Sequence, residues 1–323
     1  MSQSYESCAL CDTRKRSIEY ELPIGTIVAC ERCGLVSLVD SETSELVTCS
    51  YDAGYYHAAA GNASVGYTDY FGSEATSRDS FARSLAVGLT TRFPAARKTL
   101  DIGCGGGYLV RALADRGLDA RGVDTSAFAV AHGVEGTAGR LVEGTMSVMA
   151  DVAPFDIVTM MDVIEHLPDP VSAIRGAFSF LREGGSLVVL TPRYGGALLQ
   201  RQGTEYVHFN SDHMYYFTEQ TLSAVLRKAT GSDVATQDVL STLMDWHVAV
   251  PADVQHKYTA DRDSIIAVVT RELDVLRGAG LLQFVNHLLD VLSATTITNQ
   301  QDIRRVDDDE VFDADRRHEP ASV

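Results

Sequence analysis

The residues from 101 to 124 have the types and spacing of a nucleotide-binding turn. Gly103, Gly105 and Gly107 alternate after a short apolar run, with Asp101 before them and Asp124 after them. Glycines carry no side chain, so the backbone can approach a ligand and enter a helix. A carboxylate about 20 residues beyond such a turn can accept both hydroxyls of a ribose. The pattern therefore predicts a ribose-bearing cofactor.

The position of Asp101 indicates which of the cofactors that bind at such a glycine turn is expected here. Dinucleotide folds use GxGxxG spacing, whereas here an acid precedes alternating glycines as Asp-Ile-Gly-Cys-Gly-Gly-Gly. A carboxylate at Asp101 would attract the cationic amino group of a methionine moiety and repel a pyrophosphate. We therefore expect S-adenosylmethionine and not a nicotinamide cofactor.

Four of the six cysteines form two CxxC pairs near the start of the chain. Cys8 and Cys11 are followed, after 18 residues, by Cys30 and Cys33. Two such pairs can supply four thiolates to a tetrahedral Zn²⁺. The alternative, two disulfides or free thiols, fits a cytoplasmic chain less well. The spacing predicts a zinc ribbon whose metal is structural, because a closed site of four cysteines leaves no coordination position open for catalysis.

Asp162, Glu165 and His166 have the spacing of one helical face. Positions i, i+3 and i+4 lie together if the segment forms a helical turn. Such a face could line the cofactor cavity and position a substrate, or it could only shape the loop. Its oxygen-rich ligands with one imidazole would also suit Mg²⁺ or a similar cation, although aspartate at 162 reaches less far than glutamate. We favour the first interpretation, with Asp162 beside the cofactor.

Alternating strands and helices must position these residues. Apolar periodicity predicts strands at about 98–103, 119–124, 139–142, 155–161 and 185–191. It predicts helices at about 74–92, 107–117, 126–132, 170–182 and 218–230. Such alternation indicates an α/β fold, a parallel sheet with helices on both faces. The glycine turn and Asp124 then meet at the carboxyl ends of the strands.

Three further segments extend the pattern of the glycine turn. They are Phe155–Pro170, Arg182–Pro192 and Tyr206–Thr218. The first two are similar to the fourth strand and fifth strand of class I S-adenosylmethionine-dependent methyltransferases, and the third is similar to a segment of small-molecule and sugar methyltransferases. The resemblance covers about residues 5 to 230 and implies a Rossmann-like methyltransferase sheet.

Thr145 marks a departure from that family. After the third strand the family often places an acid that bonds the adenine amino group, whereas this chain has Leu141-Val-Glu-Gly-Thr-Met146. A hydroxyl or a main-chain carbonyl could take the place of the acid. The expected cofactor-binding residues are Asp101, Gly103, Cys104, Gly105, Gly107, Asp124, Thr125, Thr145, Met146 and Asp162.

Two further histidines, His208 and His213, lie in the segment that by resemblance overhangs the methyl-transfer site. An imidazole can accept a proton from a hydroxyl or an activated carbon near neutral pH. His213 is the better candidate, because His213-Met-Tyr-Tyr-Phe217 is similar to the His-x-x-Tyr-Phe of sugar C-methyltransferases. Those enzymes often carry a second histidine where this chain has Ser211, and a structural histidine is the alternative. The expected catalytic residues are His213, His208, His166 and Glu165.

The remaining segments suggest a modular chain. We expect a zinc-binding ribbon at 1–48, a tyrosine-rich lid and leading helix at 49–97, and the S-adenosylmethionine-binding domain at 98–250. Residues 233–250 would add two closing strands. Apolar positions between Asp261 and Thr295 recur at helical spacing, which predicts a helical extension at 251–300 that serves as core or as the interface of a homodimer. Residues 301–323 read as a disordered acidic tail.

Composition limits the partners of the chain. A formal charge of −17 repels a polyanion, so we expect no nucleic acid as substrate. No apolar run reaches about 18 residues and the first residues lack a signal peptide, which predicts a cytoplasmic protein without a membrane partner.

These observations predict a methyltransferase that acts on an oxygen or carbon of a small molecule. The setting implied by the resemblance is secondary-metabolite or sugar tailoring. Two alternatives stay open at this point. One is an enzyme of the same fold that uses S-adenosylmethionine for cyclisation or aminocarboxypropyl transfer. The other is a zinc-ribbon binding protein whose cofactor site is vestigial.

Overall fold

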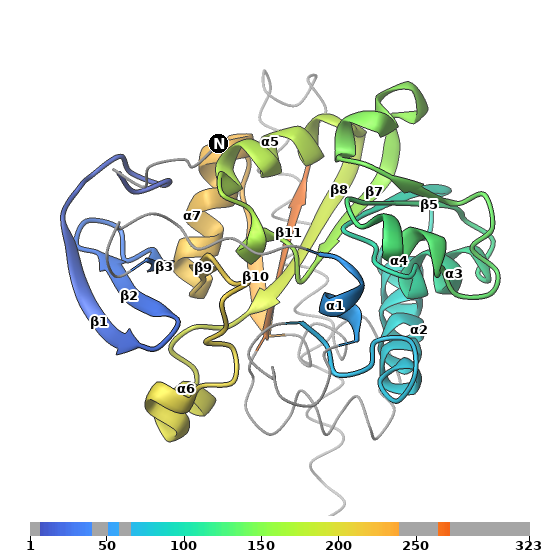
Figure 1. Cartoon of the computed structure of the whole chain (residues 1–323). Coiled ribbons are helices and arrows are strands. Elements are labelled where there is room, and N and C mark those ends of the chain that lie inside the picture. The colour runs from blue at the N-terminus through green and yellow to red at the C-terminus, as the bar shows by residue number, and fades with distance from the viewer. Residues whose placement is uncertain (1–6, 41–50, 58–65, 239–263, 272–323) are drawn as a thin grey trace, which may run out of the picture. The chain divides into compact units, whose positions relative to one another are not determined.

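A seven-stranded sheet forms the centre of the structure (Figure 1). The computed structural model describes residues 7–40, 51–57, 66–238 and 264–271. The strands lie in the order β10-β11-β8-β7-β4-β5-β6, and their bounds are β4 Lys98–Ile102, β5 Asp119–Asp124, β6 Leu141–Glu143, β7 Phe155–Met161, β8 Leu181–Pro192, β10 Ala235–Asp238 and β11 Ser264–Thr270. Strands β4 to β8 pair in parallel, which confirms the predicted parallel sheet.

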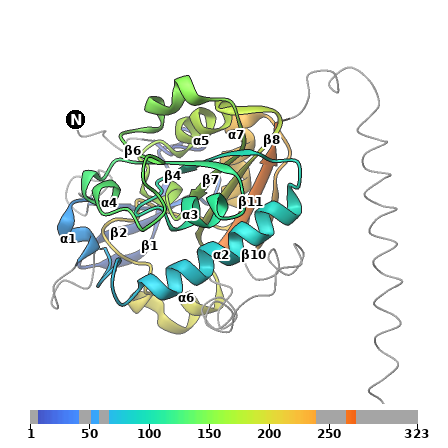
Figure 2. The ribbon, with the colours of Figure 1, turned by 90° about the vertical axis from the view of Figure 1, so that its right-hand side faces the viewer.

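Helices cover both faces of this sheet, as predicted. The longer helices are α2 Ala75–Arg92, α3 Tyr108–Ala114, α5 Pro170–Ser179 and α7 Glu219–Thr230. Alternate residues of a strand point to opposite faces, so Val158 and Met160 of β7 join one core with α5 and α7, whereas Ile157 joins the other with α2 and α3. Figure 2 looks onto the side that carries α2 and α3.

The remaining helical segments are short. They are α1 Ala53–Tyr56, α4 Ala127–Ala131, α6 Ala197–Gln202 and the 3₁₀ turns at Met146–Val152, Ile164–His166 and Gly203–Glu205. No helix among the described residues is long and apolar enough to cross a membrane.

The strand order places a crevice beside β4. The chain runs from β4 to β5 and β6 on one side, then returns to β7 on the other side of β4. The loops that follow β4 and β7 therefore diverge at their carboxyl ends. In open α/β sheets, ligands bind at such a switch point.

A second sheet joins the N-terminal segment to a strand from much later in the chain. It has the order β1-β2-β3-β9, with β1 Arg16–Leu22, β2 Gly25–Cys30, β3 Val36–Val39 and β9 Tyr215–Tyr216. Val36 pairs with Tyr216 and Ser37 with Tyr215, and the Leu38 amide donates to the Met214 carbonyl (3.0 Å). The described residues all belong to one compact unit, Met1–Glu272.

One predicted element is wrong. Residues 264–270, which we expected in a helical extension, form strand β11 between β8 and β10. Ile265 and Ile266 are both buried, in the cores on opposite faces of the sheet. An apolar run that is buried on both faces shows no period of two, so its spacing also fits a helix. The rest of 251–300, the proposed homodimer interface and the acidic tail lie outside the described residues.

Candidate active site

A cavity of about 350 Å³ opens at the carboxyl ends of β4 and β5. Nine of the ten predicted cofactor-binding residues line it: Asp101, Gly103, Cys104, Gly105, Asp124, Thr125, Thr145, Met146 and Asp162. The exception is Gly107, which caps the N-terminus of α3 in the left-handed conformation (φ 80°). A side chain there would come within 2.9 Å of Leu141, so this glycine serves the turn and its packing.

The glycine turn brings bare backbone to the cavity wall. Gly103 and Gly105 have φ values of 72° and 51°, which residues with side chains rarely adopt. A Cβ atom on Gly105 would lie 2.4 Å from the hydroxyl of Tyr70, and one on Gly103 would lie 2.4 Å from Val163. Larger residues at either position would therefore fill space that the cavity needs.

Asp124 fastens the glycine turn to the end of β5. Its two carboxylate oxygens accept hydrogen bonds from the amides of Gly105 and Ser126, each at 2.8 Å. Burial raises the pKa of Asp124, and these two N–H groups oppose that shift. The carboxylate stands where a ribose would meet it in the predicted cofactor site.

Asp101 is a buried acid at the end of β4. It is 5% exposed and accepts a hydrogen bond from the Thr159 hydroxyl at 2.6 Å. Burial raises the pKa of Asp101 to about 7, against the opposing effect of that hydrogen bond. A cation in the cavity would stabilise the ionised form, as expected for a group that meets the amino end of a methionine moiety.

Tyrosines from the segment before α2 cover the cavity. Its wall includes Tyr51, Tyr55, Tyr56, Tyr67 and Tyr70. The Ser126 hydroxyl donates to the carbonyl of Tyr51 (2.7 Å), and the Gly106 amide donates to the hydroxyl oxygen of Tyr70 (3.3 Å). These contacts attach the tyrosine segment to the loops that follow β5 and β4.

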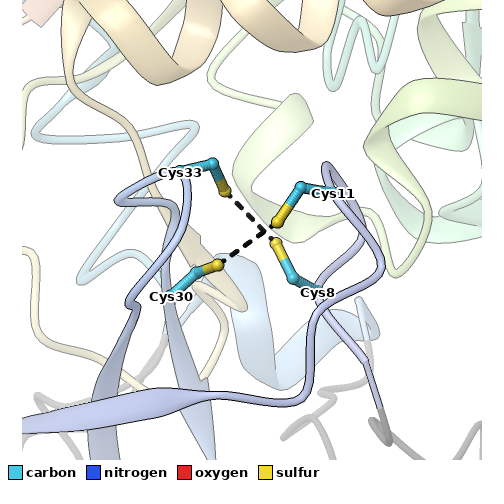
Figure 3. Close-up of side chains that lie close together, drawn as sticks. All are labelled: Cys8, Cys11, Cys30 and Cys33. Carbon is cyan, nitrogen blue, oxygen red and sulfur yellow. Dashed lines mark hydrogen bonds between the residues drawn. The ribbon is translucent and has the colours of Figure 1, made fainter.

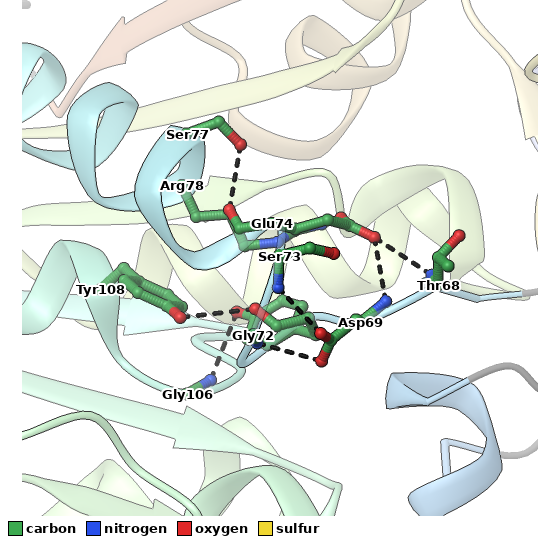
Figure 4. Close-up of polar contacts among 10 residues, drawn as sticks. Thr68, Asp69, Gly72, Ser73, Glu74, Ser77, Arg78, Gly106 and Tyr108 are labelled. Atoms are coloured by element: carbon green, nitrogen blue, oxygen red, sulfur yellow. Dashed lines mark hydrogen bonds and ion pairs between the residues drawn. The ribbon is translucent and has the colours of Figure 1, made fainter.

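Arg78 of α2 contacts the same segment, and Figure 4 shows it next to Glu74. Its guanidinium lies over the rings of Tyr67 and Tyr70, 4.0 and 4.2 Å from their centroids. It also pairs with Glu74 at 2.7 Å, and Glu74 accepts hydrogen bonds from the amides of Thr68 and Asp69. The first turn of α2 thus fixes the tyrosines above the glycine turn.

His166 is the predicted catalytic histidine that lines the cavity. Its Nδ1 lies 2.6 Å from the carbonyl oxygen of Asp212, which can only accept a hydrogen bond. Nδ1 therefore carries the hydrogen, and Nε2 of the neutral ring has a free lone pair. Burial lowers the pKa of His166, although the charge of Asp212 opposes this, so the ring is neutral at pH 7.

The other predicted catalytic residues do not line this cavity: they are His213, His208 and Glu165. His213 is 7% exposed, and its ring centroid lies 4.8 Å from that of His166. Burial and the neighbouring histidines lower the pKa of His213 well below its usual value, and its Nδ1 bonds the carbonyl of His208. Glu165 is 1% exposed and accepts from the Thr191 hydroxyl (2.9 Å). The structure therefore does not place His213, our preferred base, in reach of a substrate.

The expected helical face of Asp162, Glu165 and His166 does not form. Asp162 has a left-handed φ of 53°, and the 3₁₀ turn begins only at Ile164. Asp162 consequently points to the cavity while Glu165 is buried. The close group instead contains Glu165, His166 and His213, whose ligand atoms lie within 4.8 Å of one another. The oxygen-rich set that would suit Mg²⁺ is not assembled.

The four ribbon cysteines converge between two loops (Figure 3). The sulfur atoms of Cys8 and Cys33 are 3.5 Å apart, and those of Cys11 and Cys30 are 3.4 Å apart. A zinc tetrahedron with Zn–S bonds of about 2.3 Å has S–S edges of about 3.8 Å, so the group fits this ion after a small expansion. Although burial opposes it, the amides of Cys33 and Arg32 lower the pKa of Cys30 to about 7.

Comparison with known proteins agrees with this geometry. Residues 77–237, just under half of the chain, match a family model described as a methyltransferase domain. By this match, the segment is a methyltransferase domain. The glycine turn, the cavity residues Asp101, Asp124 and Asp162, and His166 lie within it.

Curated relatives match about a third of this chain. "Ubiquinone biosynthesis O-methyltransferase" of Pseudomonas aeruginosa (strain UCBPP-PA14) is 40% identical over 104 residues, which is 30% of this chain and 45% of that protein. The protein of the same name from Pseudomonas entomophila (strain L48) is 36% identical over 122 residues, 35% of this chain and 53% of its own length. The chain thus spans about half the length of the curated relatives it matches.

Solved structures include other methyltransferases. The plantazolicin methyltransferase BpumL, in complex with a monoazolic desmethylPZN analog and SAH, has a TM-score of 0.48 at 11% identity and covers 62% of this chain and 87% of its own. An S-adenosylmethionine-dependent methyltransferase from Clostridium acetobutylicum ATCC 824 has a TM-score of 0.45 at 15% identity, with 59% and 92% covered.

Sequence reasoning missed two residues of the methyltransferase domain. Arg78 stood within a predicted helix, where a single cation is usually a surface residue. Asp212 was overlooked beside His213, although a carboxylate between two histidines in a segment over the site is a signal that could have identified it.

Proposed function

We propose that the chain transfers the methyl group of S-adenosylmethionine to an oxygen or carbon of a small molecule. The observation that carries this proposal is the convergence of Asp101, the glycine turn and Asp124 on one cavity that His166 also lines. A ribose, a cationic methionine end and an acceptor each find a matching group there. The family of the domain supports the same assignment.

The proposed cofactor would lie across the ends of β4 and β5. Asp124 would accept the ribose hydroxyls, Asp101 would face the amino group, and Thr145 and Met146 would flank the adenine. When bound, the cofactor supplies an activated methyl carbon, and the pair of electrons of the broken S–C bond stays on sulfur. The protein's contribution is then to orient the acceptor and to accept its proton.

His166 is the proposed general base. Nε2 has the free lone pair, because the Asp212 carbonyl holds the hydrogen on Nδ1. The acceptor's proton would move to Nε2 as its oxygen or carbon forms the new bond to the methyl carbon. Tyr51 and Tyr55 offer flat apolar surface beside the ring, which suits the exclusion of water from the reacting atoms.

Three finer proposals accompany this one. The four-cysteine group would hold structural Zn²⁺, the chain would be cytoplasmic, where thiols stay reduced, and the acceptor would belong to secondary-metabolite or sugar tailoring. The last proposal is supported by the likeness of Tyr206–Thr218 to sugar methyltransferases.

The deciding experiment is analysis of the sulfur product. The purified protein is incubated with S-adenosylmethionine and a pool of hydroxylated and carbon-acid acceptors, and the products are identified by mass spectrometry. Methyl transfer leaves S-adenosylhomocysteine, whereas cyclisation or aminocarboxypropyl transfer leaves methylthioadenosine. Failure of the protein to bind the cofactor in calorimetry would favour a vestigial site and contradict the proposal.

A further inference from the structure

Asp212 is a buried carboxylate next to the cavity with few partners for its charge. It is 3% exposed, and its Oδ2 accepts a hydrogen bond from the Tyr55 hydroxyl at 2.9 Å. Its Oδ1 is buried and has no hydrogen-bond partner. No arginine or lysine of the described segments forms an ion pair with it. Burying a carboxylate in this way is costly unless a cation forms nearby.

His166 is the group that would become that cation. The main-chain carbonyl of Asp212 bonds Nδ1 of His166 at 2.6 Å, so the residue that fixes the tautomer also carries a negative charge that acts on the ring. When Nε2 accepts a proton, the imidazolium meets a carboxylate that is shielded from water. Opposite charges that are shielded from water attract each other more strongly than exposed ones.

Tyr55 connects the same carboxylate to the tyrosine segment. Tyr55 lies in α1 and is 8% exposed, and its ring packs edge-on against Tyr51, whose ring packs edge-on against His166. One hydrogen bond therefore joins the cover of the cavity to the loop that bears Asp212. The carboxylate does not itself line the cavity.

We propose that Asp212 is a positioning residue for proton transfer, which fixes the tautomer of His166 through its carbonyl and stabilises the imidazolium through its carboxylate. This inference rests on the proposed function, because the imidazolium arises when the acceptor loses its proton to Nε2. The carboxylate raises the basicity of His166 against the effect of burial. It acts through His166 and touches neither cofactor nor acceptor.

Other charged and titratable groups also face His166, and the test must separate them from Asp212. They are Glu165, whose Oε1 is 4.0 Å from Nε2, together with Asp162, His213 and the edge-on ring of Tyr51. None of these changes in an Asp212→Asn variant, which keeps the shape and the main-chain carbonyl and removes only the charge.

The experiment is NMR titration of the imidazole nitrogens in ¹⁵N-histidine-labelled full-length protein without substrate. We expect His166 to titrate from the Nδ1-protonated tautomer, and Asp212→Asn to lower its pKa by about one unit. Tyr55→Phe removes the hydrogen bond and keeps the charge, so the pKa of His166 should not fall. Asp151→Asn, an exposed carboxylate in the Met146–Val152 turn, is the charge-matched control and should leave it unchanged.

Kinetics supply the second measurement. In Asp212→Asn the acidic limb of the kcat profile should move to lower pH. The value of kcat should fall by at most about tenfold, which is the effect of one pKa unit when the proton is fully transferred in the transition state. KM for S-adenosylmethionine should stay near that of the parent. An unshifted His166, or an equal fall of its pKa in Asp212→Asn and Tyr55→Phe, would overturn the inference. Absence of methyl transfer with an intact NMR response would refute the proposed function alone.

Discussion

At the residue scale, the cavity depends on buried acidic side chains that accept hydrogen bonds from main-chain amides or from a hydroxyl. Asp124 satisfies the amides of Gly105 and Ser126, so it shapes the turn before any ligand binds. Asp101 has one hydroxyl donor and is otherwise enclosed. The same acids can therefore preorganise the loop and recognise polar groups of a ligand.

Replacing Asp124 tests the cofactor site. Asp124→Ala should weaken S-adenosylmethionine binding by about 1.5–3 kcal/mol, the range for hydrogen bonds to a charged group. Gly105→Val should abolish binding, because its Cβ alone would lie 2.4 Å from the Tyr70 hydroxyl. Calorimetry measures both, with Asp151→Ala as the surface control. Parent-like affinity in both cavity variants would show that the cofactor binds elsewhere.

Replacing the two histidines in turn tests the base. His166→Ala should lower turnover by about 10²–10⁴-fold while cofactor affinity stays near the parent value, because the proton is lost only in the chemical step. His213→Ala should cost less, since this ring lies behind His166. The parent's rate should fall only below the ordinary imidazole range, because burial lowers the pKa of His166. The reverse order of the two losses would return the role to His213, and rescue of either variant by Mg²⁺ would indicate a metal.

Local patterns could predict which residues line the cavity, because these residues follow the ends of strands. The glycine turn and Asp124 are tied to β4 and β5, and parallel strands gather their ends at one edge. The choice between His166 and His213 depends instead on which imidazole the loop turns toward the cavity. That is decided by the left-handed φ of Asp162 and by the Asp212 carbonyl, neither of which leaves a periodic signal.

At the element scale, β9 connects the ribbon to the segment that bears Asp212 and His213. β9 begins two residues after His213 and pairs with β3. The Lys228 ammonium of α7 donates to the carbonyl of Leu10 (2.8 Å). Cys8, Leu10 and Cys30 are buried in the same core as Phe217. The ribbon thus supports the segment that bears Asp212.

Removing the proposed zinc tests this support. The purified chain should carry about one equivalent of zinc by elemental analysis, and Cys8→Ser with Cys30→Ser should lose it. Hydrogen exchange should then become faster in β3 and in residues 213–217, because the ladder between β3 and β9 loses its anchor. Cys104→Ser, at a buried thiol outside the ribbon, is the matched control. A metal-free ribbon with unchanged exchange would contradict the assignment.

The strands β10 and β11, beyond β8 in the sheet, show which elements could not be predicted from the sequence. β10 begins within the predicted range, but its partner β11 comes from residues 264–270. A run such as Ser-Ile-Ile-Ala-Val-Val-Thr is apolar at every position that either a helix or a buried strand would require. The choice between helix and strand depends on pairing with β8, whose edge is available once the parallel sheet has formed.

At the scale of the whole molecule, buried acidic groups make the free energy of unfolding depend on pH. The chain has a formal charge of −17, and the pKa of Asp101 is raised to about 7 by burial. The pKa of an aspartate in the unfolded chain is about 3.9. At pH values between this pKa and that of Asp101 in the folded protein, the folded state binds more protons than the unfolded state. The stability from this group is complete below pH 4 and is lost as the pH rises through about 7.

Thermal unfolding of the ligand-free protein tests whether its stability decreases as the pH rises. We expect the melting temperature to fall between pH 5.5 and pH 8, and the fall to be smaller in Asp101→Asn, which cannot ionise. S-adenosylmethionine should stabilise the parent more at pH 8 than at pH 5.5, since its amino group favours the ionised carboxyl. The same pH dependence in parent and variant would remove Asp101 from this explanation.

The pairing of β3 with β9 also has a consequence for synthesis and for engineering. The ribosome makes β1 to β3 before β9, which lies some 175 residues further along the chain. The four-stranded sheet therefore stays incomplete until most of the methyltransferase domain has been translated. A ribbon transplanted from another protein would need a matching β9. Recombination between homologous genes would accordingly succeed when both parts of this small sheet come from the same parent.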